Sequence, residues 1–338
     1  MNVALIGNGG REHALAYKIS ESNNLTKLYI IPGNPGTASC GENVDIKIDN
    51  KTILGFCKDK NIDLVVIGPE QPLVDGLSDF LCENGLKVFG PSAKASQIEG
   101  DKVFSKNLMK KYKIPTAAFE VFKREEKIKA EEYIRNSNFP LVLKAYGLAA
   151  GKGVLICNNF TEAVNGLKLI FEENAFGNAG EKIVIEEFMQ GEEASVFAIT
   201  DGNDFITLPA AQDHKRIFDN DEGKNTGGMG SYSPAPVITE DLQKEINQTI
   251  ILPTLKAMEA EGCKFSGCLY CGLMITNEGP KVVEFNCRFG DPEAQVVLPI
   301  IQGDFLKLLL SAAEGKLDKS QYKYENKSAV CIVAASAG

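Results

Sequence analysis

The chain has 338 residues, of which 44% are hydrophobic and 24% are charged, a composition typical of globular proteins and sufficient for two or three domains. Its net charge of −9 argues against non-specific binding to nucleic acids or anionic membrane surfaces, because both are polyanions. A zinc site is improbable, since the nine cysteines are scattered and there are only two histidines. The N-terminus has too few apolar residues for a signal peptide, so we expect a reduced, cytoplasmic protein without membrane-spanning segments.

The first hundred residues alternate apolar strand patterns with helical patterns. "NVALIG", "KLYIIP", "DLVVIG" and "LKVFG" read as strands. This order predicts a doubly wound parallel sheet, in which ligands bind beyond the carboxyl ends of the strands. Those ends carry residues 7–12, 32–34, 68–71 and 90–92.

The first of these loops, "GNGGRE", matches a dinucleotide-binding turn only in part. Glu12 stands where the third glycine belongs, and the second strand has no acid at its end to bind a ribose. An NAD-dependent oxidoreductase is therefore disfavoured. A glycine loop before a helix, with Arg11 nearby, suits a small phosphate monoester, and Glu70 could accept hydrogen bonds from a sugar. A packing turn with a solvated arginine explains this segment equally well.

The middle of the chain, "FPLVLKAYGLAAGKGVLICNN", reads as a strand ending in Lys144, a glycine loop containing Lys152, and a second strand. It is not a Walker A loop, because Gly153 replaces the Ser or Thr that holds magnesium and a strand follows instead of a helix. Such a loop can fold over a polyphosphate. The alternative is a flexible surface hairpin.

The next segment, "EKIVIEEFMQGEEASVFAI", joins two apolar strands through a bend rich in glutamate. A bend of this kind can offer backbone donors and acceptors to an adenine, and Glu193 could take the ribose hydroxyls. Exposed glutamates are usually only solvated, so the interpretation depends on the glycine loop beside it.

Residues 212–234 show no apolar periodicity and are dense in charge and glycine. We expect a long connection without regular structure, and such connections are usually functional or disordered. The strands on either side favour a functional segment. His214 in this segment is more often a hydrogen-bonding bystander than a general base.

The strand "KVVEFNCRFGDPEAQ" places Glu284 and Asn286 two residues apart, so both side chains point to the same face. One carboxylate and one amide oxygen, with positions left for phosphate and water, fit magnesium bound to a nucleotide. Arg288 can grip a carboxylate or a phosphoryl group, and Asp291 an ammonium. The pattern predicts magnesium-assisted phosphate transfer onto a small carboxylate.

With these motifs in order, the chain resembles the ATP-grasp superfamily and, more narrowly, the phosphoribosylamine–glycine ligase (glycinamide ribonucleotide synthetase) family of de novo purine synthesis. The resemblance rests on "GNGGREHAL", "PGNPGTA", "GPEQPLV", "GLAAGKGV", "IEEFMQGEEAS", "QDHKR", "NTGGMG" and "EFNCRFGDPE". It implies an α/β protein with an N-terminal parallel-sheet domain at 1–102 and an ATP-grasp α+β domain at 103–325. A mobile lid subdomain would span about 120–190, and 326–338 would begin a truncated C-terminal domain.

The resemblance also implies the chemistry: ATP phosphorylates glycine, and 5-phosphoribosylamine attacks the glycyl phosphate to give glycinamide ribonucleotide. It implies phosphoribosylamine binding by Gly9, Gly10, Arg11, Glu12, Asn34 and Glu70. It implies ATP binding by Lys106, Lys144, Lys152, Glu186, Phe188 and Glu193. Glycine would lie among Asp213, Lys215, Arg288 and Asp291, and Mg²⁺ or Mn²⁺ on Glu284 and Asn286.

Among these residues Arg288, Lys144 and Asp213 would be catalytic. Two alternatives stay open: an ATP-grasp ligase that joins a different acid or amine, and a catalytically silent nucleotide sensor, which the Glu284 and Asn286 pair disfavours. We expect a monomer or a weak homo-oligomer.

Overall fold

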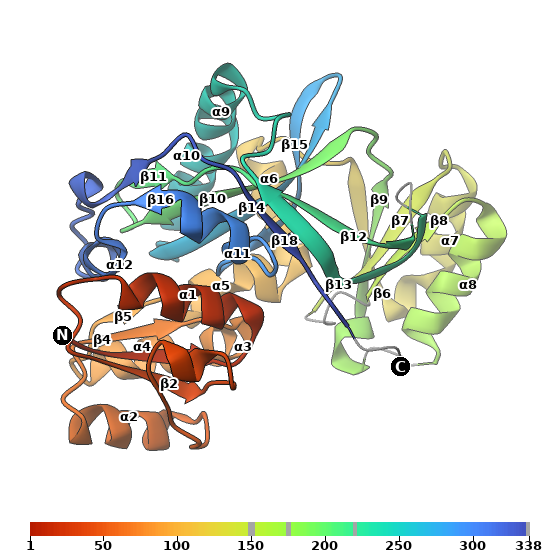
Figure 1. Ribbon diagram of the computed structural model, residues 1–338. Helices are drawn as coiled ribbons and strands as arrows, with labels where there is room; N and C mark the ends of the chain where they lie inside the picture. Colours follow the sequence, from red (N-terminus) through yellow and green to blue (C-terminus); the bar gives the residue numbers. More distant parts are fainter. Residues whose placement is uncertain (148–152, 174–176, 219–221, 336–338) are drawn as a thin grey trace.

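The structure, a computed structural model, describes residues 1–147, 153–173, 177–218 and 222–335. Its first hundred residues form a five-stranded parallel sheet in the order β3-β2-β1-β4-β5, with helices around it (Figure 1). The strands are β1 (Asn2–Gly7), β2 (Lys27–Pro32), β3 (Glu42–Asn43), β4 (Leu64–Ile67) and β5 (Val88–Phe89). The helices are α1 (Gly10–Ser20), α2 (Asn50–Asp59), α3 (Glu70–Val74), α4 (Leu77–Glu83) and α5 (Ala93–Gly100). The predicted doubly wound domain is confirmed.

Glu12 explains why the first loop is not a dinucleotide turn. Its carboxylate accepts a hydrogen bond from Gly9 N at 2.7 Å and lies folded against the ends of β1 and β4. A Cβ on Gly68 would lie 2.2 Å from Glu12 Oε1, and a Cβ on Gly7 would lie 2.4 Å from Glu12 Cγ. The buried glutamate therefore fills the space that the dinucleotide turn leaves for close packing of helix on strand.

A second, antiparallel sheet lies at the centre of the molecule, in the order β11-β10-β14-β15. Its strands are β10 (Glu192–Thr200), β11 (Phe205–Thr207), β14 (Gly267–Thr276) and β15 (Gly279–Asn286). The accompanying helices are α6 (Lys102–Tyr112), α9 (Glu240–Ile246), α10 (Leu252–Ala260), α11 (Ala294–Val297) and α12 (Phe305–Ala313), and a π-helical turn at Asn247–Ile251 joins α9 to α10. Two hydrophobic clusters run from the N-terminal sheet into this part, so the two domains pack through a shared core.

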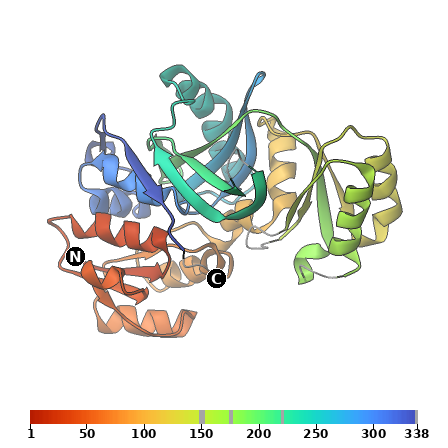
Figure 2. The same cartoon turned by 45° about the vertical axis from the view of Figure 1, so that its right-hand side comes forward.

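Residues 119–187 contain a separate antiparallel sheet, β6-β9-β7-β8, covered by two helices. The elements are β6 (Phe119–Lys123), α7 (Lys127–Arg135), β7 (Leu141–Ala145), β8 (Val154–Cys157), α8 (Phe160–Phe171) and β9 (Lys182–Glu187). They enclose a hydrophobic cluster of their own and lie apart from the N-terminal domain in both views (Figures 1 and 2). A lid subdomain requires such a separate core. That this subdomain moves stays a prediction.

Residues 212–234 are the place where the expected structure is wrong. Instead of an irregular connection, β12 (Gln212–Phe218) and β13 (Glu222–Ser233) form an antiparallel pair with register shifts. β18 (Ala329–Ile332) pairs with the other edge of β13, and the short strands β16 (Ile301–Gln302) and β17 (Lys323–Tyr324) pair with each other. Backbone hydrogen bonds hold such a ribbon together without alternating apolar residues, which is why the period-2 pattern is missing.

The remaining short turns are 3₁₀ helices at Thr37–Ser39, Arg124–Glu126, Gly177–Gly180, Leu298–Ile300 and Lys319–Gln321. Within the described part of the chain, none of the helices is long and apolar enough to cross a membrane.

Candidate active site

A cavity of about 420 Å³ opens between the lid strands, the central sheet and the helices α5 and α6. This volume is in the range of small-molecule sites. Predicted site residues from every part of the chain line it: Glu70, Lys106, Lys144, Glu186, Phe188, Glu193, Asp213, Lys215, Glu284, Asn286, Arg288 and Asp291. Five predicted residues of the N-terminal domain lie outside this lining: Gly9, Gly10, Arg11, Glu12 and Asn34. Lys152 lies outside the described residues.

Two buried lysines meet one buried glutamate in the cavity wall. Glu186 Oε2 lies 3.1 Å from Lys106 Nζ and 3.0 Å from Lys144 Nζ. Lys106 also donates to Thr116 Oγ1, and Lys144 to the carbonyl of Val283. Burial lowers the pKa of Lys106 to about 8 against the opposing charge of Glu186. The cluster presents two ammonium groups that are poorly hydrated and ready to meet an anion.

The lysines occupy Glu186 Oε2, whereas Glu186 Oε1 has no hydrogen-bond partner among the described residues. Beyond it, the bend at Phe188 lies beside apolar lining residues from both sides of the cavity, which include Met109, Val142, Val154 and Met274. Glu193, at the start of β10, is exposed. This apolar part of the lining, which we call the apolar slot, together with a nearby carboxylate fits a nucleoside.

Glu284 and Asn286 both point into the same cavity from β15, as their spacing predicts. Although burial opposes ionisation, the charges of Lys215, Lys144 and Lys102 hold the pKa of Glu284 below its ordinary value. With its amide turned to donate, Asn286 places Nδ2 2.9 Å from Glu99 Oε1. The carboxylate of Glu284 is therefore ionised, and the side-chain oxygen of Asn286 is left free to bind a ligand.

These two residues fit a divalent cation that takes its other ligands from a substrate. Within the described residues there is no group of three or more His, Cys, Asp and Glu side chains that could hold a metal ion by themselves. Magnesium keeps several water or phosphate ligands and needs only one or two protein oxygens. The donor set thus suits a nucleotide-bound ion better than a metal cage made wholly by the protein.

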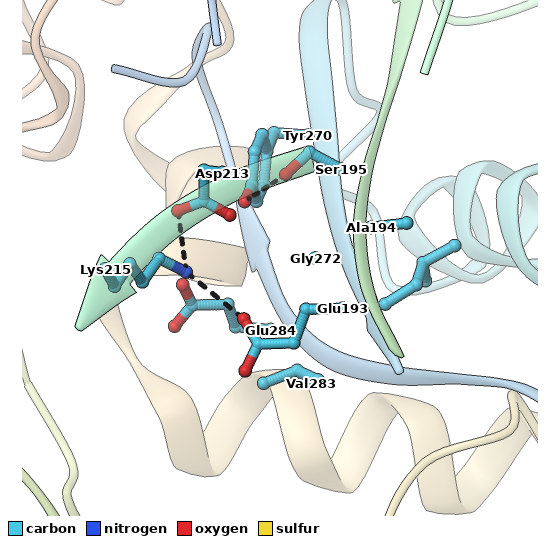
Figure 3. A pocket seen from close by; sticks show the side chains of 10 residues that line it. Glu193, Ala194, Ser195, Asp213, Lys215, Tyr270, Gly272, Val283 and Glu284 are labelled. Atoms are coloured by element: carbon cyan, nitrogen blue, oxygen red, sulfur yellow. Dashed lines mark hydrogen bonds and ion pairs between the residues drawn. The ribbon is translucent and has the colours of Figure 1, made fainter. Parts of the chain in front are cut away.

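A second charged group surrounds Lys215 on β12 (Figure 3). Lys215 Nζ lies 3.3 Å from Asp213 Oδ2 and 3.7 Å from Glu193 Oε2. Burial would lower the pKa of Lys215, but the carboxylates of Asp213, Glu284 and Glu193 raise it above the ordinary value. A lysine held charged beside several carboxylates is suited to orient a small zwitterion.

Glu293 belongs to this group and was missed by the sequence analysis. Its Oε1 accepts hydrogen bonds from Ser195 Oγ at 2.9 Å and Tyr270 Oη at 3.0 Å, and the side chain is buried. Burial and the nearby charge of Asp213 raise the pKa of Glu293, while Lys215 opposes the rise. "GDPE" contains the residue, but no feature of the sequence shows that the turn points it back into the core.

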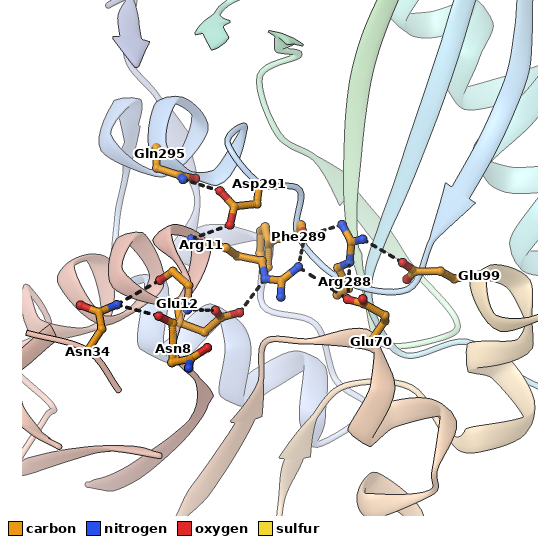
Figure 4. Close-up of polar contacts among 11 residues, drawn as sticks. Asn8, Arg11, Glu12, Asn34, Glu70, Glu99, Arg288, Phe289, Asp291 and Gln295 are labelled. Atoms are coloured by element: carbon orange, nitrogen blue, oxygen red, sulfur yellow. Dashed lines mark hydrogen bonds and ion pairs between the residues drawn. The ribbon is translucent and has the colours of Figure 1, made fainter. Parts of the chain in front are cut away.

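Arg288 lies at the meeting point of three chain segments (Figure 4). Its guanidinium donates to Glu99 Oε1 at 2.8 Å, to Glu70 Oε2 at 3.3 Å and to the carbonyl of Phe289 at 3.1 Å. Glu70 was expected to meet a sugar. In the structure it pairs with Arg288, whose charge lowers the pKa of Glu70 although burial opposes the shift.

Arg11 and Glu12, expected to face a substrate phosphate and ribose, are both buried. Arg11 Nε lies 2.6 Å from Glu12 Oε1, and Arg11 Nη1 donates to the carbonyl of Phe289 at 3.3 Å. The pair joins the N-terminal domain to the Arg288 segment. Asn34 braces the same loop by donating to the carbonyl of Asn8 at 2.9 Å (Figure 4).

Asp291 lies at the amino end of α1, where its Oδ2 is 3.4 Å from Arg11 N and its Oδ1 accepts from Gln295 at 2.6 Å. The exposed carboxylate therefore lies between the glycine loop of Gly9 and Gly10 and the large cavity. The two predicted substrate sites are neighbours in space.

The family model for the N domain of phosphoribosylglycinamide synthetase matches residues 1–99, and the model for its ATP-grasp (A) domain matches residues 100–294. The chain belongs to the phosphoribosylamine–glycine ligase family. Its members are ATP-dependent ligases of purine biosynthesis.

Individual members of the phosphoribosylamine–glycine ligase family match the whole chain. The enzyme of Caldanaerobacter subterraneus is 44% identical over all of this chain and 81% of its own length, and that of Brucella melitensis is 48% identical over all of this chain and 79% of its own. The crystal structure of the Thermotoga maritima enzyme superposes with a TM-score of 0.82 at 36% identity, covering 98% of this chain and 80% of that one.

Proposed function

We propose that this chain joins glycine to 5-phosphoribosylamine through glycyl phosphate, with ATP converted to ADP and phosphate. One observation carries the proposal. A single cavity holds the paired lysines Lys106 and Lys144, the oxygen pair Glu284 and Asn286, and the guanidinium of Arg288. Phosphoryl transfer to a carboxylate requires such a concentration of positive charge around the transferred group.

ATP would lie under the lid. Its adenine fits the apolar slot beside Phe188, with the backbone of Glu186 at the adenine edge and Glu193 at the ribose. Its phosphates would meet the ammonium groups of Lys106 and Lys144, and Lys152 in the glycine loop would cover them. A metal ion on Glu284 and Asn286 would neutralise the phosphate charge that develops during transfer.

Glycine would bind between Arg288 and the Lys215 group. Arg288 and Lys215 suit its carboxylate, and Asp213 and Asp291 suit its ammonium. A carboxylate oxygen of glycine attacks the γ-phosphorus, and the bond from phosphorus to the bridging oxygen of ADP breaks. Lys144 stabilises the charge on the transferred phosphoryl group, so glycyl phosphate forms beside the N-terminal domain.

Phosphoribosylamine would come from the side of the N-terminal domain. Its phosphate would lie near the loop of Gly9, Gly10 and Asn34 at the amino end of α1, beside the carboxylates of Glu12 and Asp291 that accept from Gly9 N and Arg11 N. The amine nitrogen attacks the glycyl carbonyl carbon, the bond from that carbon to the phosphate oxygen breaks, and the proton lost by the nitrogen is balanced by the departing phosphate, which leaves as hydrogen phosphate. The position of Asp291 at the α1 terminus, 3.4 Å from Arg11 N, supports this approach because it joins the two sites.

A coupled assay for ADP release tests the proposal. We expect ADP only when glycine and phosphoribosylamine, generated in the cuvette, are both present, and glycinamide ribonucleotide in equal amount. Alanine in place of glycine, and ammonia in place of phosphoribosylamine, serve as controls for a ligase with another acid or amine. ADP release that is indifferent to glycine would refute the proposal.

A further inference from the structure

Glu99, in the last turn of α5, reaches from the N-terminal domain into the wall of the large cavity. It is buried, and its two oxygens meet three consecutive residues at the end of β15. Figure 4 shows the contact with Arg288. Oε2 accepts from Cys287 N at 2.8 Å, and Oε1 accepts from Arg288 Nη2 at 2.8 Å. When the Asn286 amide is turned so that its NH₂ group faces Glu99, Oε1 also accepts from Asn286 Nδ2 at 2.9 Å. One carboxylate thus contacts every residue from 286 to 288.

This contact decides which end of the Asn286 amide faces the cavity. An amide has one donating and one accepting arm, and the two are nearly equal in shape. The guanidinium of Arg288 favours the ionised form of Glu99. Because an ionised carboxylate can only accept, Glu99 holds the NH₂ group of Asn286, and the side-chain oxygen of Asn286 faces the other way. The same carboxylate, together with Glu70 and the carbonyl of Phe289, fixes the plane of the Arg288 guanidinium.

We propose that Glu99 is a positioning residue that turns the oxygen of Asn286 toward the metal ion and aims Arg288 at glycine. The inference rests on the proposed metal site at Glu284 and Asn286. If Glu99 has this role, the catalytic centre depends on the N-terminal domain, because Glu99 belongs to helix α5 of that domain and orients both Asn286 and Arg288. Partners behind a metal ligand commonly set its orientation in this way.

A carboxylate at position 99 is required because every group that faces it is a donor. Glutamine has the same shape but presents one NH₂ group, which would meet either Cys287 N or the donors of Asn286 and Arg288. If the glutamine NH₂ group faces Asn286, the two donors are accommodated only when Asn286 reverses its amide, and this turns the NH₂ group of Asn286 toward the metal. Aspartate keeps the charge but is one methylene shorter, so it cannot make all three hydrogen bonds.

The test is Mn²⁺ affinity, measured by electron paramagnetic resonance with the whole chain and a non-hydrolysable ATP analogue. We expect Glu99→Gln and Glu99→Asp each to bind Mn²⁺ about 10- to 100-fold more weakly. Affinity for the nucleotide analogue in EDTA should stay near the wild-type value. The double variant Glu99→Gln with Asn286→Asp should regain Mn²⁺ affinity, because the new carboxylate can accept from the glutamine NH₂ group and still offer an oxygen to the ion.

Glu70→Gln is the matched control, because it removes a carboxylate from Arg288 without touching Asn286. Its Mn²⁺ affinity should stay close to the wild type. Mn²⁺ affinity that is unchanged in Glu99→Asp, or reduced as strongly in Glu70→Gln, would overturn the role of Glu99, since charge alone would then explain the effect. Glu284→Gln separates the two proposals: if it leaves Mn²⁺ binding intact, the metal site itself is misplaced.

Discussion

Glu186→Gln probes the charge state of the lysines that would hold the ATP phosphates. Glutamine is close in shape, and its oxygen can stay between Lys106 and Lys144 while its NH₂ group takes the place of Glu186 Oε1, which has no partner among the described residues. The substitution therefore removes one negative charge with little change in packing. The ammonium of Lys106 is left buried beside the ammonium of Lys144.

The size of the effect follows from the geometry. An opposite charge in contact raises the pKa of a lysine, so its loss should take the pKa of Lys106 below its wild-type value of about 8. At pH 8 the variant would then carry a neutral Lys106. A hydrogen bond between charged groups contributes about 1.5–3 kcal/mol, so nucleotide affinity should fall about 10- to 150-fold at that pH.

The direction in which nucleotide affinity changes with pH is fixed, because a phosphate binds the protonated lysine. Affinity is full below the pKa that Lys106 has in the free enzyme and falls as pH rises through it. In the wild type this fall lies near pH 8, and in the variant it moves to lower pH. Below the lowered pKa of the variant, where its Lys106 is protonated again, the variant should bind the nucleotide at least as tightly as the wild type, since a nearby negative charge is gone.

The measurement is the Kd of a non-hydrolysable ATP analogue by calorimetry between pH 5.5 and 9. The ratio of variant to wild-type Kd at each pH cancels the protonation of the nucleotide. Glu187→Gln is the control, because its exposed side chain accepts from Ala118 N at 3.0 Å and raises the pKa of Lys106 less than Glu186 does. A ratio that stays constant with pH would refute the reasoning.

Three further predictions concern the other parts of the site. Glu284→Ala should abolish turnover at every Mg²⁺ concentration while circular dichroism shows a folded protein; wild-type turnover would contradict the metal role. Lys144→Ala should raise the KM for ATP about tenfold or more, and an unchanged nucleotide affinity by calorimetry would count against its phosphate contact. Arg11→Ala should lower the free energy of unfolding by about 3–5 kcal/mol, because it leaves the buried carboxylate of Glu12 without its cation. In the double variant Arg11→Ala with Glu12→Gln, urea titration should show part of that stability restored. If it is not restored, the lost ion pair is not the cause of the destabilisation.

The sequence predicted the N-terminal sheet and the strand of Glu284 and Asn286 because both rest on local periodicity. "NVALIG" is apolar at nearly every position, as a strand buried on both faces must be, and β1 indeed lies in the middle of its sheet. The pleat alone puts Glu284 and Asn286 on one face. The same reasoning did not predict the strands in residues 212–234, because a ribbon held together by backbone hydrogen bonds needs no alternation of apolar and polar side chains.

By itself, the sequence determined which residue types were available and the order in which strands and loops present them. Only the tertiary structure decided their partners. Glu99 meets Asn286, Arg11 meets Phe289, and Glu293 meets Ser195 across separations of roughly one hundred to nearly three hundred residues. A buried charge takes the partner that the packing of whole domains brings within reach, and no local pattern of residues records that packing.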